Sequence, residues 1–261
     1  MLPQLNVPQL NVAQLWAAEG IAFRYFDWGA TFLWACTGAV LAARRGYDLT
    51  GIFAIALVSS TGGGLLRDAL FLQAGPPMLV RTPSYVVIAL LASVLTWLVG
   101  ERLLGRIPRP MVRLTQLADA LGLGAFAVVG MRLALTAQIS MAGAMLVGVV
   151  NAVGGGVLRN LLLHRTPEIF RPGHLTALAA FGGTLVYATL TAWLHIDENA
   201  AGVSAILLVA ITNWASRHYR LQTHAAWSEK TRQRRDSRIS RGTGQLTQAS
   251  ERPRRGPPPQ L

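Results

Sequence analysis

The chain has 261 residues, of which 52% are hydrophobic and 14% charged, a composition typical of integral membrane proteins and not of soluble enzymes. The formal charge of +12 is concentrated at one end, because residues 217–261 hold eleven Lys or Arg against three acids. The basicity is therefore a property of this tail and does not indicate a nucleic-acid-binding domain. The single cysteine, Cys36, excludes an intramolecular disulfide and a cysteine-based metal site.

Residues 1–20 lack the basic start and continuous apolar stretch of a cleavable signal peptide, and we expect a flexible leader at residues 1–26. Seven apolar segments follow: 27–43, 51–72, 84–104, 114–133, 140–163, 174–194 and 202–219. Each is close to the length of about 20 residues that crosses the hydrocarbon layer. A soluble helical bundle would need polar helix faces, which these segments lack. The sequence predicts an all-α integral membrane protein with seven transmembrane helices.

The connecting segments differ in their arginine content. Those after the first, third and fifth apolar segments are rich in arginine, as is the tail, whereas the remaining loops hold few arginines and include Asp197 and Glu198. Arginine-rich loops stay on the cytoplasmic side of a membrane. We therefore expect the N-terminus outside and the C-terminus in the cytoplasm.

Two apolar segments contain the same motif, three glycines followed by an arginine. Its copies are Gly62, Gly63, Gly64, Arg67, Asp68 and Gly154, Gly155, Gly156, Arg159, Asn160. Each glycine costs a helix about 1 kcal/mol relative to alanine. We expect the second and fifth helices to be broken at these triplets, which would expose backbone carbonyl oxygens and amide hydrogens to a ligand. The alternative is close packing of helices through small residues, which needs no ligand.

A shift of ninety-two residues superposes the two motifs and also brings Asp27 onto Asp119. A two-residue deletion beyond the motif then aligns Pro77 with Pro167. Residues 27–104 and 119–194 are thus predicted copies of one three-helix unit, joined by a linker at 105–118 that includes the start of span four, and followed by a seventh helix at 195–219. Because three is odd, the second copy enters the membrane from the opposite face, so the repeats are inverted.

Arg67 and Arg159 are expected to face a polar pathway, since a charge in lipid is costly. Adjacent helical residues point in different directions, which makes Asp68 a poor predicted partner for Arg67. Asp27 and Asp119 are better candidates for ion pairs, and Asp68 with Arg159 is a further possibility. In the alternative, each arginine extends to the nearer membrane interface.

Motifs typical of catalysis do not stand out in the apolar body. The sole lysine is Lys230 in the tail, and the five histidines have no metal-ligand spacing with acids or cysteines. We predict no enzyme activity, no cofactor and no resident metal, although a monovalent cation could bind transiently at backbone carbonyls. The tail, 220–261, is expected to be disordered and to contact anionic lipid; an inert tail and RNA binding are alternatives, and nucleic acid is not the expected partner.

The doubled Gly-Gly-Gly-x-x-Arg-Asp/Asn motif and the three-plus-three-plus-one helices resemble the bacterial trimeric intracellular cation (TRIC) channels, a family that overlaps proteins labelled glycine transporters. The resemblance covers residues 27–219. It implies a homotrimer in the bacterial inner membrane, with one potassium-conducting pore per subunit between the second and fifth helices. Asn160 departs from the family's usual aspartate, leaving the second repeat one formal charge more positive than the first.

Three functions are compatible with the sequence. A passive channel for potassium and other monovalent cations is the first. The second is a carrier for a small zwitterion such as glycine, in which an arginine and amide hydrogens would hold the carboxylate and an acid the ammonium. The third is a membrane scaffold in which the glycines serve only packing and nothing is transported.

Overall fold

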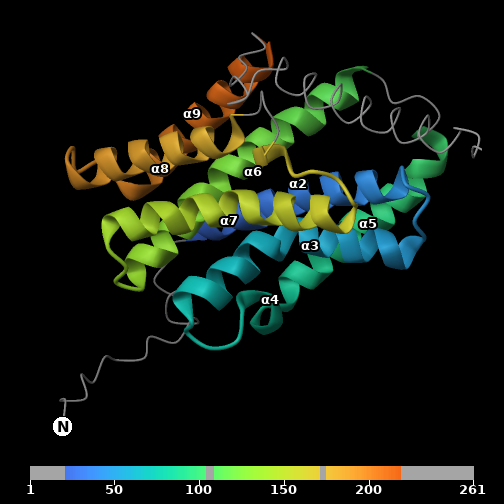
Figure 1. Ribbon diagram of the computed structural model, residues 1–261, viewed down its shortest axis with the longest axis horizontal. Helices are drawn as coiled ribbons and strands as arrows, with labels where there is room; N and C mark the ends of the chain where they lie inside the picture. The colour runs from blue at the N-terminus through green and yellow to red at the C-terminus, as the bar shows by residue number, and fades with distance from the viewer. Residues whose placement is uncertain (1–20, 104–108, 171–174, 219–261) are drawn as a thin grey trace, which may run out of the picture. The chain divides into compact units, whose positions relative to one another are not determined.

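The structure is a computed structural model that describes residues 21–103, 109–170 and 175–218, and these residues form helices and short connections without any strand (Figure 1). The predicted all-α architecture is confirmed for this part of the chain. The first twenty residues of the expected leader, residues 104–108 at the junction of the first repeat and the linker, residues 171–174, residue 219 and the expected tail at 220–261 lie outside the described residues.

Each of the seven predicted segments coincides with a long helix among the described residues. These are α2 (Ile21–Ala43), α3 (Leu49–Arg67), α5 (Pro83–Leu103), α6 (Arg109–Thr136), α7 (Met141–Leu162), α8 (Thr176–Ala192) and α9 (Glu198–His218). The shorter elements are the π-helix η1 (Asp68–Leu72), α4 (Met78–Arg81) and the 3-10 helix η2 (Glu168–Phe170). Helix α2 begins at Ile21, inside the predicted leader.

Four of these helical stretches are long and apolar enough to cross a membrane by length and composition. They are Leu49–Leu72, Gln116–Thr136, Met141–Leu162 and Glu198–Ser216. Helices α5 and α8 supply two shorter apolar stretches, Pro83–Val99 and Thr176–Ala192. In a membrane such surfaces face lipid and not water. The exposed leucines and valines on α5 are therefore expected, and no partner protein is needed to cover them.

Equivalent residues begin the two glycine-containing helices. Asp48 accepts a hydrogen bond from the Gly51 backbone N–H at 2.8 Å and caps α3. Ser140, ninety-two residues later, accepts the same bond from Gly143 at 3.3 Å and caps α7. Asp and Ser are preferred caps because their side-chain oxygens satisfy amides that the first helical turn leaves unpaired. The aligned sequences thus start their helices in the same way.

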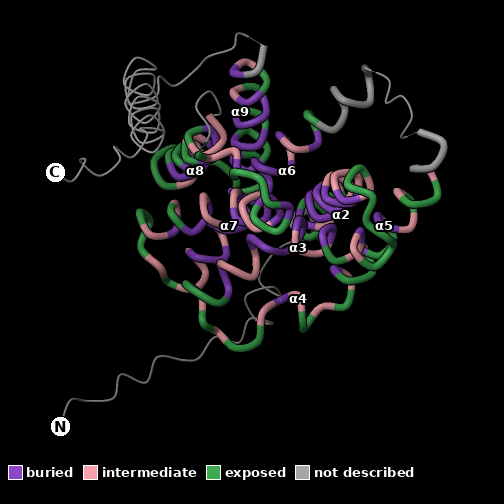
Figure 2. Tube along the Cα trace, turned by 45° about the vertical axis from the view of Figure 1, so that its right-hand side comes forward, coloured by how far each residue is buried: buried purple, intermediate pink, exposed green. Residues whose placement is uncertain are grey.

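The helices of the two halves make the same set of contacts. Helix α2 packs on α3 and α5, and α3 packs on α5; α6 packs on α7 and α8, and α7 packs on α8. The halves meet where α3 crosses α7 and where α2 lies against α6 (Figure 1). Helix α9 covers α6 and α8. Burial is densest along α6, whereas α5 and α8 present many exposed residues (Figure 2).

The structure does not confirm the predicted breaks at the glycine triplets, because α3 and α7 remain helical through them. Packing explains the glycines instead. A Cβ on Gly63 would overlap the backbone carbonyl of Asn151, and a Cβ on Gly155 would overlap that of Ser59. The two helices therefore approach through backbone atoms, which only glycine permits at these positions. This is the packing role that the sequence left as the alternative.

The contacts at this crossing are reciprocal. A Cβ on Gly62 would lie 2.9 Å from a methyl of Leu158, and a Cβ on Gly154 would lie 2.9 Å from a methyl of Leu66. Each contact has a counterpart in which both residues are replaced by their equivalents ninety-two positions away. The contact of Gly62 with Leu158 corresponds to that of Gly154 with Leu66, and the contact of Gly63 with Asn151 corresponds to that of Gly155 with Ser59. Exchange of partners between two copies is what a local two-fold axis produces.

Candidate functional site: two equivalent cavities with buried arginines

Two small cavities flank the crossing of α3 and α7, one for each glycine motif. The first, of about 30 Å³, contains Arg67 and Asp68, and the second, of about 40 Å³, contains Arg159 and Asn160. Each has room for about two water molecules. The last glycine, the arginine and the Asp or Asn of each motif thus line a cavity of their own repeat. The first two glycines of each triplet lie instead at the helix crossing and line neither cavity.

The walls of the two cavities come from equivalent sequence positions. At the shift of ninety-two, the paired lining residues are Asp27 and Asp119, Thr31 and Leu123, Thr61 and Val153, Gly64 and Gly156, Leu65 and Val157, Arg67 and Arg159, and Asp68 and Asn160. Beyond the motif, at a shift of ninety, Met78 pairs with Glu168 and Leu79 with Ile169. Each cavity is also closed by an aromatic ring of the other repeat, Phe126 in the first and Trp34 in the second.

Arg67 is paired with Asp68, contrary to the sequence expectation. The Asp68 Oδ1 atom lies 2.8 Å from Arg67 Nε and 2.7 Å from Nη2, and both side chains are buried. The expectation was wrong because the long arginine side chain folds along the helix surface and Asp68 starts the π-helix η1, where the backbone changes from its α geometry. The other carboxylate oxygen, Oδ2, accepts the backbone N–H of Met78 at 2.9 Å. Asp68 therefore pairs with its own repeat and not with Arg159.

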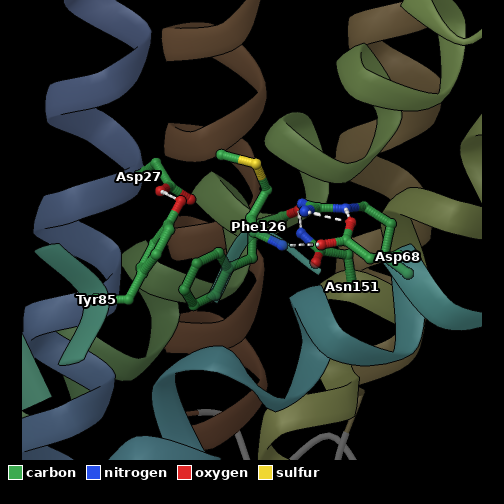
Figure 3. A network of polar contacts seen from close by, with 7 residues as sticks. Asp27, Asp68, Tyr85, Phe126 and Asn151 are labelled. Carbon is green, nitrogen blue, oxygen red and sulfur yellow. Dashed lines mark hydrogen bonds and ion pairs between the residues drawn. The ribbon is translucent and has the colours of Figure 1, made fainter. Parts of the chain in front are cut away.

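Asp27 is bonded to a group that the sequence did not single out. The Tyr85 hydroxyl, from the start of α5, donates to Asp27 Oδ2 at 2.6 Å, and both side chains are buried. Figure 3 shows this pair and the Asp68 group as two separate clusters. A buried carboxyl group needs such a donor, because an unsatisfied one is costly. Leu175 stands at the aligned position of the second repeat, so this hydrogen bond has no counterpart there.

Arg159 is buried, with 5% of its surface exposed, and makes weaker contacts than Arg67. Its Nη1 donates to Ser59 Oγ at 3.3 Å, and its guanidinium carbon lies 5.9 Å from the centre of the Trp34 ring. Its Nε has no hydrogen-bond partner among the described residues. Burial of both arginines beside polar cavities argues against the alternative in which each extends to a membrane interface.

The second cavity contains two carboxylates. Asp119, the predicted counterpart of Asp27, lies in its wall, and so does Glu168, which the sequence reasoning did not select. The alignment that pairs Pro77 with Pro167 places Glu168 opposite Met78, so the signal was present in the sequence. With carboxyl groups ionised, the described lining residues of each cavity carry one positive and two negative charges, a formal net charge of −1. The extra positive charge expected from Asn160 is therefore offset inside the cavity.

Two aromatic rings lie between the cavities. Trp34 and Phe126, which are equivalent in the repeats, meet edge to face with ring centroids 5.5 Å apart. Both also line a third cavity of about 10 Å³, together with Gly63, Gly155 and Asn151. The Asn151 amide donates to the Phe126 carbonyl at 2.6 Å and holds α6 against α7. The sequence analysis did not select either ring, although both are aromatic residues at the same position of their repeats, ninety-two residues apart.

Metal-ligating side chains do not gather in the described part of the chain, where no group of three or more His, Cys, Asp or Glu could hold a metal ion. The polar groups at the two cavities are instead guanidinium, carboxylate, hydroxyl and amide groups. Such groups suit a small ion or zwitterion that exchanges with water.

The family model described as Glycine transporter matches this chain twice, at residues 24–101 and 116–192. The two matches span nearly the same residues as the predicted repeats. The chain belongs to this family of membrane proteins.

Known proteins of the same kind agree with this membership. The chain is 33% identical over 201 residues to a UPF0126 membrane protein of Deinococcus radiodurans, a match covering 77% of this chain and 89% of that one. It is 31% identical to the UPF0126 inner membrane protein YadS of Escherichia coli K12, covering 77% of this chain and 95% of that one. Together with the apolar helices, these relatives identify a multi-pass membrane protein.

A solved structure extends the likeness to the fold. The TRIC trimeric intracellular cation channel orthologue from Rhodobacter sphaeroides matches with a TM-score of 0.70 at 28% identity, covering 77% of this chain and 99% of that one. The resemblance to TRIC channels is thereby confirmed, and the helices of this protein have the TRIC fold.

Proposed function

We propose that this protein is a monovalent cation channel, with potassium as its main ion, whose pathway runs along the crossing of α3 and α7. The observation that carries the proposal is the pair of equivalent cavities on the two sides of this crossing, whose described lining residues give each a formal net charge of −1. Negative cavities in a low-dielectric surrounding attract cations and repel anions. The structural likeness to a TRIC cation channel supports the same conclusion.

The pathway that we propose has two ends related by symmetry. Seven helices cross the membrane as two inverted three-helix repeats and one further helix, with the N-terminus outside and the C-terminus in the cytoplasm of the bacterial inner membrane. The Arg67 cavity then opens toward the outside and the Arg159 cavity toward the cytoplasm. The reciprocal contacts at the helix crossing support the inverted arrangement.

Ions would pass between the cavities by displacing the contact of Trp34 with Phe126. Asp27, Asp68, Asp119 and the polar groups around the arginines would replace part of the ion's hydration shell, as carbonyl and carboxylate oxygens do in channels. Three subunits would each contain one such pathway, since the structurally similar Rhodobacter protein is a trimeric channel. We place anionic lipid at the basic tail.

A carrier for glycine or a similar zwitterion is the second candidate. Each cavity places a guanidinium group and carboxylates around a space of a few tens of Å³, which suits a carboxylate and an ammonium group at once. The family's description as Glycine transporter favours this alternative. It predicts saturable uptake, whereas a channel predicts flux that rises with voltage without saturating at low concentration.

Purified protein in liposomes tests the two candidates side by side. Potassium flux is measured under an imposed membrane voltage, and uptake of labelled glycine is measured in the same preparation. Voltage-driven potassium flux that a Gly63→Leu variant loses supports the channel, because leucine there collides with the Asn151 backbone. Glycine uptake without ion current would replace the channel by the carrier, and neither activity would favour a scaffold.

A further inference from the structure

The described lining of each cavity holds two acidic residues. Asp27 and Asp119 are equivalent, but the second acid stands at a different position in each repeat. In the first repeat this acid is Asp68, whose Oδ2 accepts the backbone N–H of Met78 at 2.9 Å. Residues 68 and 78 are thus direct neighbours at the wall of the first cavity. In the second repeat, the position of Asp68 holds Asn160 and the position of Met78 holds Glu168. The acid has moved from the helix end to the adjoining segment while remaining in the wall of the same cavity.

The second cavity depends on Glu168 for its negative charge. Without it, the described lining residues would hold only Arg159 and Asp119, with a formal net charge of zero. Arg159 also differs from Arg67 in its surroundings. It is buried, and its Nε has no hydrogen-bond partner among the described residues, so no adjacent carboxylate compensates it as Asp68 compensates Arg67. A cavity with no net charge, beside a guanidinium that has no carboxylate paired with it, attracts cations less than a negative cavity does where the dielectric constant is low.

We propose that Glu168 is the functional counterpart of Asp68 and sets the cation selectivity of the second cavity by offsetting the charge of Arg159. The proposal rests on the cation-channel function proposed above. Glu168 lies at the start of η2, in the segment that joins α7 to α8, and is half-buried. Because Glu168 is part of the cavity wall, its charge acts directly on an ion that passes through the cavity. The described linings of the two cavities therefore have equal formal charge despite the unequal motifs.

Four variants of the full chain test this role in liposomes that separate two concentrations of potassium chloride. Glu168→Gln removes the charge and keeps the shape, and Glu168→Met copies the first repeat without its aspartate. Asn160→Asp combined with Glu168→Met transfers the complete first-repeat arrangement to the second. Asp48→Asn is the matched control, because Asp48 is exposed, lies outside both cavities, and caps α3 through an oxygen that asparagine retains.

The reversal potential reports the ratio of potassium to chloride permeability. We expect both single Glu168 variants to lower this ratio by about three-fold or more, as loss of one charge near the pathway implies. The double variant should return to the wild-type ratio, and Asp48→Asn should keep it throughout. A merely structural role of Glu168 would change the amount of folded protein without this rescue, and that amount is measured by size-exclusion chromatography.

The outcomes separate this inference from the proposed function. Wild-type protein that carries no cation current refutes the channel, and this inference with it. If wild-type protein is cation-selective but Glu168→Gln has the same reversal potential, the role of Glu168 is refuted and the channel stands. A double variant that remains as unselective as Glu168→Met refutes the equivalence with Asp68.

Discussion

The Trp34 and Phe126 rings meet edge to face, and each ring closes the cavity of the repeat to which it does not belong. The two residues are ninety-two positions apart, like the glycines that cross beside them. Their contact therefore lies between the two halves of the proposed pathway. In the proposed pathway, the aromatic pair separates the two cavities with apolar surface, which an ion would cross only after displacing a ring or its neighbours.

Removing one ring should join the cavities. We expect Phe126→Ala to raise potassium flux several-fold relative to wild type at the same voltage. The free energy of unfolding should fall by about 3–5 kcal/mol, because a buried phenyl group is lost. Flux in liposomes and thermal unfolding in detergent measure the two effects. Phe181→Ala is the control, since Phe181 is exposed on α8, and it should change neither quantity. Unchanged flux in a folded Phe126→Ala protein would contradict a barrier at this contact.

Neighbouring glycines of one triplet should respond differently to alanine. A Cβ at Gly63 overlaps the Asn151 carbonyl, whereas a Cβ at Gly64 comes no closer than 3.7 Å to Arg67 Nη2. Gly63→Ala should lower the free energy of unfolding by at least about 1–3 kcal/mol, because the helices must separate. Gly64→Ala should be neutral or stabilising by up to about 1 kcal/mol through its helix propensity. Melting temperatures of both variants check this, and equal effects would refute close backbone packing as the role of the triplet.

The Arg67–Asp68 pair should show strong coupling. Asp68→Asn keeps an oxygen for the Met78 amide but leaves a buried guanidinium without its counter-charge, and we expect a loss of about 3–5 kcal/mol. Replacing both residues with leucine should cost less than the sum of the two single leucine variants. A double-mutant cycle on thermal unfolding measures the coupling energy. If the effects of the two single leucine variants simply add, the interaction between Arg67 and Asp68 contributes nothing to stability.

Removing the Tyr85 hydroxyl should lower the free energy of unfolding more than removing an exposed tyrosine hydroxyl does. Tyr85→Phe keeps the ring and removes the donor to Asp27, leaving a buried carboxyl group with one hydrogen bond fewer. The expected loss in the free energy of unfolding is about 1–3 kcal/mol. Tyr25→Phe is the matched control, because Tyr25 is exposed on the same helix as Asp27. Equal melting temperatures of the two variants would contradict a structural role of this hydrogen bond.

Membrane class and helix positions could both be predicted from the sequence. Long apolar stretches and their turn signals define helices locally, so all seven predicted segments coincide with helices in the described part of the chain. The shift of ninety-two residues also predicts internal repeats and pairs Arg67 with Arg159, and each of these arginines lines a cavity. These properties follow from neighbours along the chain or from its self-similarity, and neither requires knowing which helix faces which.

Only the tertiary structure decided what the conspicuous residues touch. Three glycines in a row are compatible with a broken helix and with close helix packing, and the position of the Asn151 carbonyl against Gly63 favours packing. Helical periodicity made Asp68 a poor partner for Arg67, yet the flexible arginine and the π-helical turn bring them together. The position of Glu168 in the wall of the second cavity likewise depends on how the segment after α7 packs against that helix. Side-chain partners of this kind are set by contacts between segments distant in sequence, which local patterns do not specify.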